Sequence, residues 1–336
     1  MQKTVLVSGS SGFVGTNLCR RLIDRDYKVI ALVRGDHHKQ MLEEMGATRV
    51  VCQITDTDCL RDALKKADYV IDVIGKASDW GNYNSFLIPN VLGVKNLLEE
   101  SMRADIKKFV HISSVAIHGF GNHVDTTEEG PFYKLDFPYC VTKREGENLV
   151  LDAYRKHSFP VTSIRPCNVY GVNDMGVIFK IAHALMNRSV PHVDGGKWLT
   201  SPVYVGNLAD AIILAMEKDE AVGEAFIISD GLRITWREWD LKLCQALGVK
   251  GPWFSVPGFL ARFIGASLEF FAKLFGSDNP PPFTRYRARQ VCSNYHFSVE
   301  KAKRVLGWKP ETDIDTAVEK TIKWFKEEYL RSLGKI

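Results

Sequence analysis

Short apolar runs alternate with longer amphipathic stretches over the first 170 residues of the chain. Each run is short enough to be a buried strand, and each stretch has the apolar spacing of a helix. Strands joined by helices of this length form βαβ units, whose parallel sheet carries helices on both faces. The pattern therefore predicts a doubly wound α/β fold. The runs are 4–8, 28–33, 49–54, 69–75, 108–114 and 160–166, and the stretches are 16–25, 38–46, 58–66, 86–103 and 141–157.

The alternation breaks after residue 171, where a smaller and mostly helical region begins. We expect one large domain built from 1–171 and 203–230, and a second domain built from 172–202 and 231–336. The elements expected in this half are a helix at 175–187, a strand entering a helix at 201–216, a strand at 224–229, an extended link at 279–283 and a cationic amphipathic helix at 313–331.

The most apolar part of the chain is the aromatic-rich segment 253–276, which Arg262, Glu269 and Lys273 interrupt. Its apolar residues recur at roughly helical spacing, so it reads as one amphipathic helix or a pair of them. Two interpretations remain open. In the first, the helix covers its own domain. In the second, it forms either a lid over an apolar substrate or a contact with a membrane surface.

Composition narrows the class of protein. The chain has 336 residues, 45% of them hydrophobic, and a formal charge of +4 on 44 basic and 40 acidic residues. No block of like charges resembles a nucleic-acid tail, so we expect no nucleic-acid partner. Seven scattered cysteines, without metal-ligand spacing, and the lack of an export leader at the start favour reduced thiols in a cytoplasmic protein without a bound metal.

Three glycines, Gly9, Gly12 and Gly15, follow the first strand and precede the first helix. At such a place one glycine permits a tight turn, a second lets the backbone approach a pyrophosphate, and a third lets the helix pack close to the sheet. The alternative is a purely structural turn. The strand before and the helix after favour a Rossmann-type dinucleotide site, with phosphates held at the start of the helix.

The second strand ends in Val33 and Arg34, where many dinucleotide sites place an acidic residue against the ribose hydroxyls. A guanidinium there favours a 2′-phosphate, and hence NADP(H), over NAD(H). His37, His38 and Lys39 add positive potential, and Asp36 opposes it. The alternative is that Arg34 is a solvated loop residue.

Two further features supply candidate chemistry. Tyr139 and Lys143 are four residues apart and share one face of an expected helix, where the ammonium would lower the pKa of the phenol for proton transfer. Ser113 and Ser114 end a buried strand, at the edge of the sheet where ligands bind, and a hydroxyl there could hold a substrate oxygen. Either feature alone also fits an ordinary helix or strand end.

Taken together, the glycine turn, the serine pair and Y-x-x-x-K resemble the short-chain dehydrogenase/reductase superfamily, in its extended branch of epimerases, dehydratases and 3β-hydroxysteroid dehydrogenases. The resemblance covers nearly the whole chain. The matching pieces are "SGSSGFVG", "NVLGVKNLLE", "ISSVAIHG", "YCVTKREGE", "RPCNVYG", "YVGNLADAI" and the C-terminal 297–324.

The resemblance implies catalytic roles for Ser114, Tyr139 and Lys143, and an active-site-shaping role for Asn90. It also implies that Lys143 binds the nicotinamide ribose and that the second domain binds substrate. The remaining cofactor-binding positions that it implies are Gly9, Ser11, Gly12, Phe13, Val14, Gly15, Arg34, Gln53, Ile54, Gly75, Pro166, Asn168 and Val169.

This sequence departs from the branch at two places. The usual Gly-Asp, whose aspartate binds the adenine amine, is Cys52-Gln53 here, although the Gln53 carbonyl could accept the same hydrogen bond. The usual tyrosine of the serine segment is His118, which leaves the substrate less defined. A structural role for His118 is the simpler interpretation.

The segments 75–96 and the tail from Pro280 look closest to the 3β-hydroxysteroid and sterol dehydrogenase-like group, which includes reductases of long-chain β-keto acids. The expected function is an NADP(H)-dependent interconversion of a secondary alcohol and a ketone on such an apolar substrate, with hydride passing to or from the nicotinamide. The alternatives are a nucleotide-sugar epimerase or dehydratase with tightly bound NAD, and a non-catalytic NAD(P)-binding protein. The superfamily resemblance also implies a homodimer.

Overall fold

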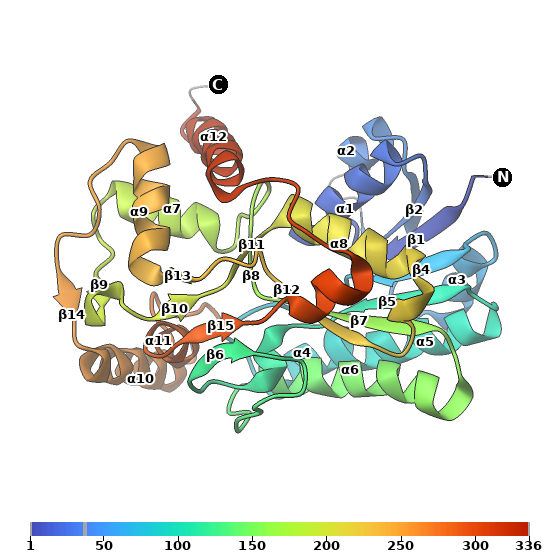
Figure 1. Ribbon diagram of the computed structural model, residues 1–336, viewed down its shortest axis with the longest axis horizontal. Helices are drawn as coiled ribbons and strands as arrows, with labels where there is room; N and C mark the ends of the chain where they lie inside the picture. The colour runs from blue at the N-terminus through green and yellow to red at the C-terminus, as the bar shows by residue number, and fades with distance from the viewer. Residues whose placement is uncertain (1, 36–38, 335–336) are drawn as a thin grey trace.

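A seven-stranded parallel sheet forms the centre of the computed structural model, which describes residues 2–35 and 39–334 (Figure 1). Its strand order is β12-β7-β5-β4-β1-β2-β3, so the chain starts in the middle and winds outwards in both directions. The predicted doubly wound α/β fold is confirmed. The strands are β1 (Thr4–Ser8), β2 (Lys28–Val33), β3 (Thr48–Val51), β4 (Tyr69–Asp72), β5 (Lys108–Ile112), β7 (Val161–Pro166) and β12 (Ala225–Ile228).

Helices cover both faces of this sheet because its strands are apolar on both sides. Along β1, Val5 and Val7 belong to one apolar cluster and Leu6 to the other, as the alternation of side chains along a strand requires. The first face carries α1 (Phe13–Asp24), α2 (Lys39–Glu44) and α8 (Val205–Glu217), and the second carries α3 (Thr57–Leu64), α5 (Gly93–Arg103) and α6 (Pro138–His157).

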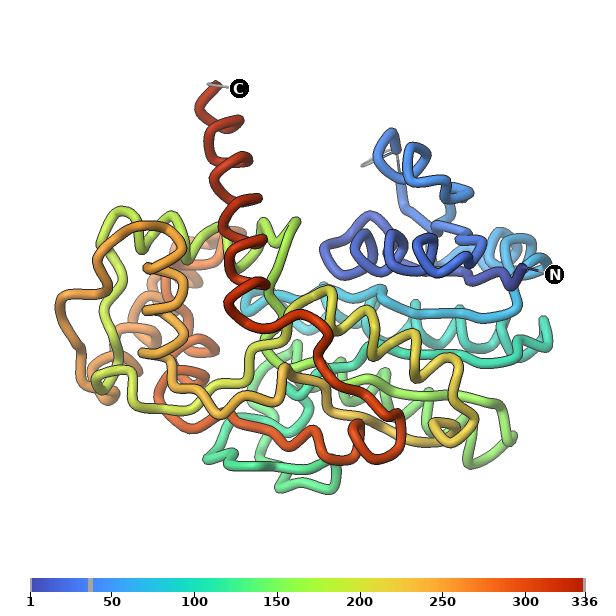
Figure 2. The backbone as a smooth tube through the Cα atoms, turned by 45° about the horizontal axis from the view of Figure 1, so that its top comes forward, coloured from blue at the N-terminus to red at the C-terminus, as the bar shows by residue number. Residues whose placement is uncertain are grey.

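The second half of the chain adds helices at one end of the sheet, away from the N-terminus (Figures 1 and 2). Three of them share an apolar cluster: α7 (Ile178–Met186), α9 (Trp236–Leu247) and α12 (Ile314–Ser332). Most of the aromatic-rich segment 253–276 forms a single helix, α10 (Gly258–Leu274), which packs against α11 (Arg285–Val291). None of the described helices has both the length and the apolar character needed to cross a bilayer.

Short strand pairs join segments that are far apart in the sequence. They are β6 (His123–Thr126) with β15 (Tyr295–Phe297), β8 (Asn168–Tyr170) with β11 (Pro202–Tyr204), β9 (His192–Val193) with β14 (Ser255–Val256), and β10 (Leu199–Thr200) with β13 (Ile234–Thr235). The apolar pattern predicted β11, as the strand that enters the helix at 201–216, but none of the pairings. The remaining elements are α4 (Tyr83–Leu87), π-helical turns at Ile88–Leu92 and Ala302–Leu306, and 3₁₀ turns at Val115–His118, Asp194–Gly196 and Asp219–Ala221.

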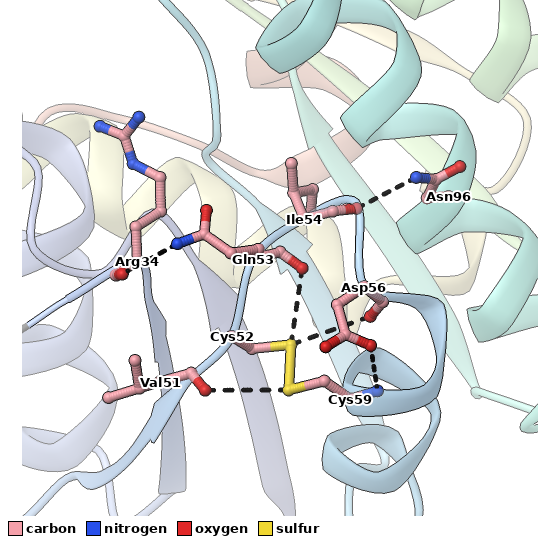
Figure 3. Close-up of a disulfide and its surroundings, with 8 residues drawn as sticks. All are labelled: Arg34, Val51, Cys52, Gln53, Ile54, Asp56, Cys59 and Asn96. Carbon is pink, nitrogen blue, oxygen red and sulfur yellow. Dashed lines mark hydrogen bonds between the residues drawn. A yellow bond between two sulfur atoms is a disulfide. The ribbon is translucent and has the colours of Figure 1, made fainter.

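Cys52 and Cys59 form a disulfide between the end of β3 and the first turn of α3 (Figure 3). The expectation of reduced thiols is therefore wrong for this pair. The chain turns back on itself after Gln53 and brings the two Cα atoms to 6.0 Å. The other five cysteines are free and buried.

Candidate active site

The glycine turn brings the start of α1 against the end of β1. The amide of Gly12 donates to the carbonyl of Gly9 at 3.0 Å, and Gly9 has a positive φ of 63°. A Cβ on Gly15 would lie 2.2 Å from the Gly9 carbonyl oxygen, so only glycine allows the helix to start this close to the strand.

The first turn of α1 provides amide groups without competing side chains. Gly12 caps the helix without a side-chain hydrogen bond, and the turn contains no acidic residue. The amides of such a turn and the helix dipole favour an anion. Ser11, Phe13 and Val14 are half-buried at this end of the helix, and Gly12 is exposed. The turn therefore fits the pyrophosphate of a dinucleotide.

Arg34 and Gln53 lie side by side where β2 and β3 end (Figure 3). The Gln53 side-chain amide donates to the Arg34 carbonyl at 3.2 Å, which leaves the Gln53 side-chain oxygen to accept from an adenine amine. Ile54 is buried, and its backbone carbonyl accepts a hydrogen bond from Asn96 at 3.1 Å. This contact fixes the turn after β3 that carries Gln53.

The guanidinium of Arg34 points away from Gln53 and from the disulfide (Figure 3). Among residues 2–35 and 39–334, no acidic side chain pairs with it. Of the charged residues expected nearby, Lys39 begins α2. Asp36, His37 and His38 lie outside the described residues.

Ser114 and Tyr139 come together at the carboxyl end of β5. The Ser114 side chain is close enough to Tyr139 to lower the pKa of its phenol, and its Oγ also accepts from the Ala116 amide at 3.1 Å. Both residues are only partly buried, so a ligand oxygen can reach them. Ser113 is fully buried beside Glu147 instead. The structure therefore separates the two serines and leaves Ser114 as the one beside Tyr139.

Lys143 lies one helical turn beyond Tyr139 on α6 and is buried. Its Nζ donates to the Ile112 carbonyl at 2.7 Å. Burial lowers the pKa of Lys143 to about 8, although Asp72 and Glu147 act in the opposite direction. A Cβ on Gly75 would lie 2.9 Å from this Nζ, which places Gly75 directly beside the amine.

The expected lowering of the Tyr139 pKa is wrong for this structure. Burial raises the pKa of Tyr139 to about 12, and the hydrogen bond from Ser114 offsets this only in part. The physical reason is that the half-buried phenol loses hydration, while the Lys143 amine is directed to the Ile112 carbonyl. Tyr139 is therefore a protonated phenol at neutral pH.

Asn90 shapes the loop next to Lys143. It is buried in the π-helical turn, its Oδ1 accepts from the Lys76 amide at 2.7 Å, and its Nδ2 donates to Thr142 Oγ1 at 3.0 Å. Asn90 thus ties the loop after β4 to the helix that carries Tyr139. Asn90 is therefore a positioning residue, because both the oxygen and the nitrogen of its side-chain amide are hydrogen-bonded within the protein.

Three expected cofactor residues follow β7. Pro166 is the buried last residue of that strand, and Asn168 and Val169 are half-buried in β8. The Asn168 side chain donates to Thr200 Oγ1 at 2.8 Å and accepts from Gln290 at 2.7 Å. Asn168 therefore connects this edge of the sheet to α11.

A buried ion pair joins α6 to strand β7. Arg165 and Glu147 approach to 2.7 Å, and Ser163 donates to Glu147 at 2.8 Å. His118 lies 3.3 Å from Arg165 and stacks on Phe132, and burial lowers its pKa to about 3. His118 is therefore neutral and structural.

Sequence reasoning missed several residues around Tyr139. Asp72 accepts from Ser8 at 2.7 Å and lies 2.9 Å from His111, inside the sheet. The signal was visible, because Asp72 and His111 are polar positions within strongly apolar runs. The ring centroids of Phe86 and Tyr286 lie 6.5 and 6.3 Å from that of Tyr139, so aromatic side chains flank the phenol ring.

The sequence profile of the NAD dependent epimerase/dehydratase family matches residues 5–229. The chain belongs to this family. It is an oxidoreductase of the extended short-chain dehydrogenase/reductase type, and its family is NAD(P)-dependent. The glycine turn and the free amides of α1 fit such a cofactor.

Individual relatives match over nearly their full length. The 2-alkyl-3-oxoalkanoate reductase of Stenotrophomonas maltophilia is 29% identical over 94% of this chain and 97% of its own. The 3-beta-hydroxysteroid dehydrogenase of Mycolicibacterium neoaurum is 28% identical over 96% of this chain and 91% of its own.

Solved structures show the same fold. The crystal structure of gox2253 has a TM-score of 0.82 at 25% identity and covers 100% of both chains. The UDP-glucose 4-epimerase of Thermotoga maritima, solved with UDP-glucose, has a TM-score of 0.78 at 22% identity over 97% of this chain and 99% of its own.

Proposed function

We propose that this protein is an NADP(H)-dependent ketoreductase whose substrate is a large apolar molecule with one reactive oxygen, such as a long-chain β-keto acid or a sterol-like ketone. The observation that carries the proposal is the Ser114–Tyr139 pair, whose members lie next to each other, are partly exposed and are flanked by aromatic rings. The activities of two relatives, a 2-alkyl-3-oxoalkanoate reductase and a 3-beta-hydroxysteroid dehydrogenase, support the substrate class. Residues 172–202 and 231–336 are the proposed substrate-binding region.

The residues of this chain have distinct roles in the proposed reaction. When bound, the nicotinamide supplies or accepts a hydride. Ser114 holds the substrate oxygen beside Tyr139, and Tyr139 gives that oxygen its proton as negative charge develops there. The raised pKa of Tyr139 keeps it in the acid form, which favours the direction of ketone reduction. Lys143 supplies a positive charge near Ser114 and Tyr139 below its pKa of about 8, and a neutral hydrogen-bond donor above it.

A substrate screen with the purified protein tests the reaction class. We expect NADPH absorbance to fall with 3-oxo acids, more steeply as the alkyl chain lengthens. A nucleotide-sugar epimerase would convert UDP-glucose without net consumption of cofactor, and a non-catalytic binding protein would turn over neither. Either of these results would contradict the proposal.

Tyr139→Phe tests the proton donor. Loss of a general acid lowers turnover by about 10² to 10⁴-fold. Affinity for the cofactor should stay within a few-fold. The matched control is Tyr154→Phe, on the exposed side of the same helix, which should leave turnover unchanged. Full activity in Tyr139→Phe would refute the mechanism.

Calorimetric titration of NADPH and NADH tests the preference for the phosphorylated cofactor. Arg34→Ala should weaken NADPH binding by about tenfold or more, because it removes a charged hydrogen bond, and leave NADH binding nearly unchanged. Lys28→Ala removes the same charge at the other end of β2 and serves as the control. A wild-type preference for NADH would overturn the role of Arg34.

A further inference from the structure

Helix α10 packs against the rest of the protein through its small residues. Its buried positions are Gly258, Ala261, Gly265 and Glu269. A Cβ on Gly265 would lie 3.0 Å from the Thr284 carbonyl, so the helix rests closely on the start of α11. The Glu269 carboxylate is directed inwards and accepts a hydrogen bond from the backbone amide of Arg285 at 2.7 Å.

The large apolar residues of α10 face outwards. Phe259, Phe263, Phe270 and Leu274 are 75%, 68%, 62% and 64% exposed, and their spacing aligns them on one stripe of the helix. With Phe275, which is 80% exposed, we call these residues the aromatic face. The segment 253–275 contains ten of the 23 exposed large apolar side chains found in the described part of the chain. This arrangement reverses the usual amphipathic helix of a globular protein.

Exposed basic side chains lie on α10 and in the segments next to it. Residues 250–289 include six basic and two acidic residues, and Lys250, Arg262, Lys273 and Arg285 are exposed, whereas Arg287 and Arg289 pair with Asp79 and Asp136. One of the two acids is Glu269, which is buried. An apolar stripe with cations beside it is typical of helices that lie in the interface of an anionic bilayer. Two copies packed through this face would bring the same positive segments together.

We propose that the aromatic face of α10 docks on a membrane surface that contains anionic lipids. With Arg262, Glu269 and Lys273 within its length, α10 suits a position parallel to the bilayer, with phenylalanines in the acyl boundary and cations at the headgroups. Figures 1 and 2 show α10 at the outer edge of the end of the molecule remote from the N-terminus, where a planar surface can reach it.

The other side of this region faces the candidate active site. The Trp80 indole donates to the Ser277 carbonyl at 3.3 Å, and Asp79 pairs with Arg287 at 2.6 Å. These contacts tie the end of α10 and the start of α11 to the loop that precedes Asn90. A docked protein would therefore hold its reactive tyrosine close to the bilayer, in which an apolar substrate dissolves. This consequence rests on the proposed function, whereas the docking itself does not.

Co-sedimentation of the full chain with lipid vesicles tests the proposal. The probes are vesicles of equal parts phosphatidylglycerol and phosphatidylcholine, and vesicles of phosphatidylcholine alone. We expect strong binding to the anionic vesicles, which weakens with added salt and with neutral lipid. The double variant Phe263→Ser/Phe270→Ser should lose at least about tenfold in partition coefficient, because two aromatic rings no longer enter the interface.

The matched control is Val177→Ser/Leu333→Ser, which removes two exposed apolar side chains elsewhere and should bind like the wild type. Lys250→Gln/Lys273→Gln should weaken binding to anionic vesicles and leave binding to neutral ones unchanged. Equal sedimentation of wild type and the Phe263→Ser/Phe270→Ser variant would overturn the proposal. Dissociation of a dimer by that variant, measured by analytical ultracentrifugation without any vesicle binding, would instead assign the face to a second copy. Because the assay requires no turnover, its failure is separate from failure of the proposed reaction.

Discussion

Replacing Lys143 by methionine removes a buried ammonium group while keeping a side chain of similar length. Burial lowers the pKa of this amine from 10.5 to about 8, so below pH 8 the folded protein holds the charge at a cost. One pKa unit corresponds to about 1.4 kcal/mol, which makes that cost on the order of 3 kcal/mol. Lys143→Met also removes the hydrogen bond from Lys143 to the Ile112 carbonyl, which destabilises the variant by about 1 kcal/mol. Lys143→Met should therefore stabilise the protein at pH 7 by roughly 2 kcal/mol and abolish turnover.

The pH dependence of this difference identifies its cause. Between pH 8 and 10.5 the unfolded chain binds the Lys143 proton and the folded chain does not, so the stability of the wild type rises with pH in that window. The advantage of Lys143→Met is thus complete below pH 8 and is lost as the pH approaches 10.5. Urea unfolding at a series of pH values from 7 upwards measures both effects.

The exposed lysine Lys95 provides the control, because Lys95→Met should change stability by no more than about 0.5 kcal/mol at any pH. If Lys143→Met is less stable than the wild type at pH 7, and the gap is the same at every pH, the amine is a well-compensated charge and the argument from burial is incorrect.

Three further experiments, two substitutions and one thiol titration, each test a single contact in the structure. Gly15→Ala should abolish cofactor binding or folding, because its Cβ would lie 2.2 Å from the Gly9 carbonyl, whereas Gly35→Ala has open space around it; thermal melts with and without NADPH compare the two. Arg165→Met leaves the buried carboxylate of Glu147 without its partner and should cost about 3–5 kcal/mol in urea unfolding, and a loss below 1 kcal/mol would contradict the buried pair. Thiol titration in denaturant should count five thiols before reduction and seven after, and seven at the outset would exclude the disulfide between β3 and α3.

Much of the site could be predicted because its signals are local. The glycine spacing, the strand that ends in two serines and the four-residue separation of Tyr139 and Lys143 all act within one strand–turn–helix unit or one helix. The order of these units along the chain then fixes which strand ends meet, since parallel strands bring their carboxyl ends to one edge of the sheet.

Other properties depend on contacts between distant segments. Which serine reaches Tyr139 depends on the packing of α6 against the 3₁₀ turn Val115–His118 that follows β5. The sign of the Tyr139 pKa shift depends on burial by Phe86 and Tyr286, which come from different parts of the chain. The disulfide also needed the fold, because a spacing of seven residues fits several local structures.

By itself, the sequence determined the doubly wound sheet, the dinucleotide turn and the Y-x-x-x-K pair, because short-range periodicity and spacing specify them. It could not determine the direction in which 253–276 faces. The apolar spacing of that segment predicts an amphipathic helix, but the pattern does not show whether the phenylalanines face the protein or the surface. Only the tertiary structure decided this, because the close approach of α11 admits Gly265 and Ala261 and leaves no room for the phenylalanines, which therefore face outwards.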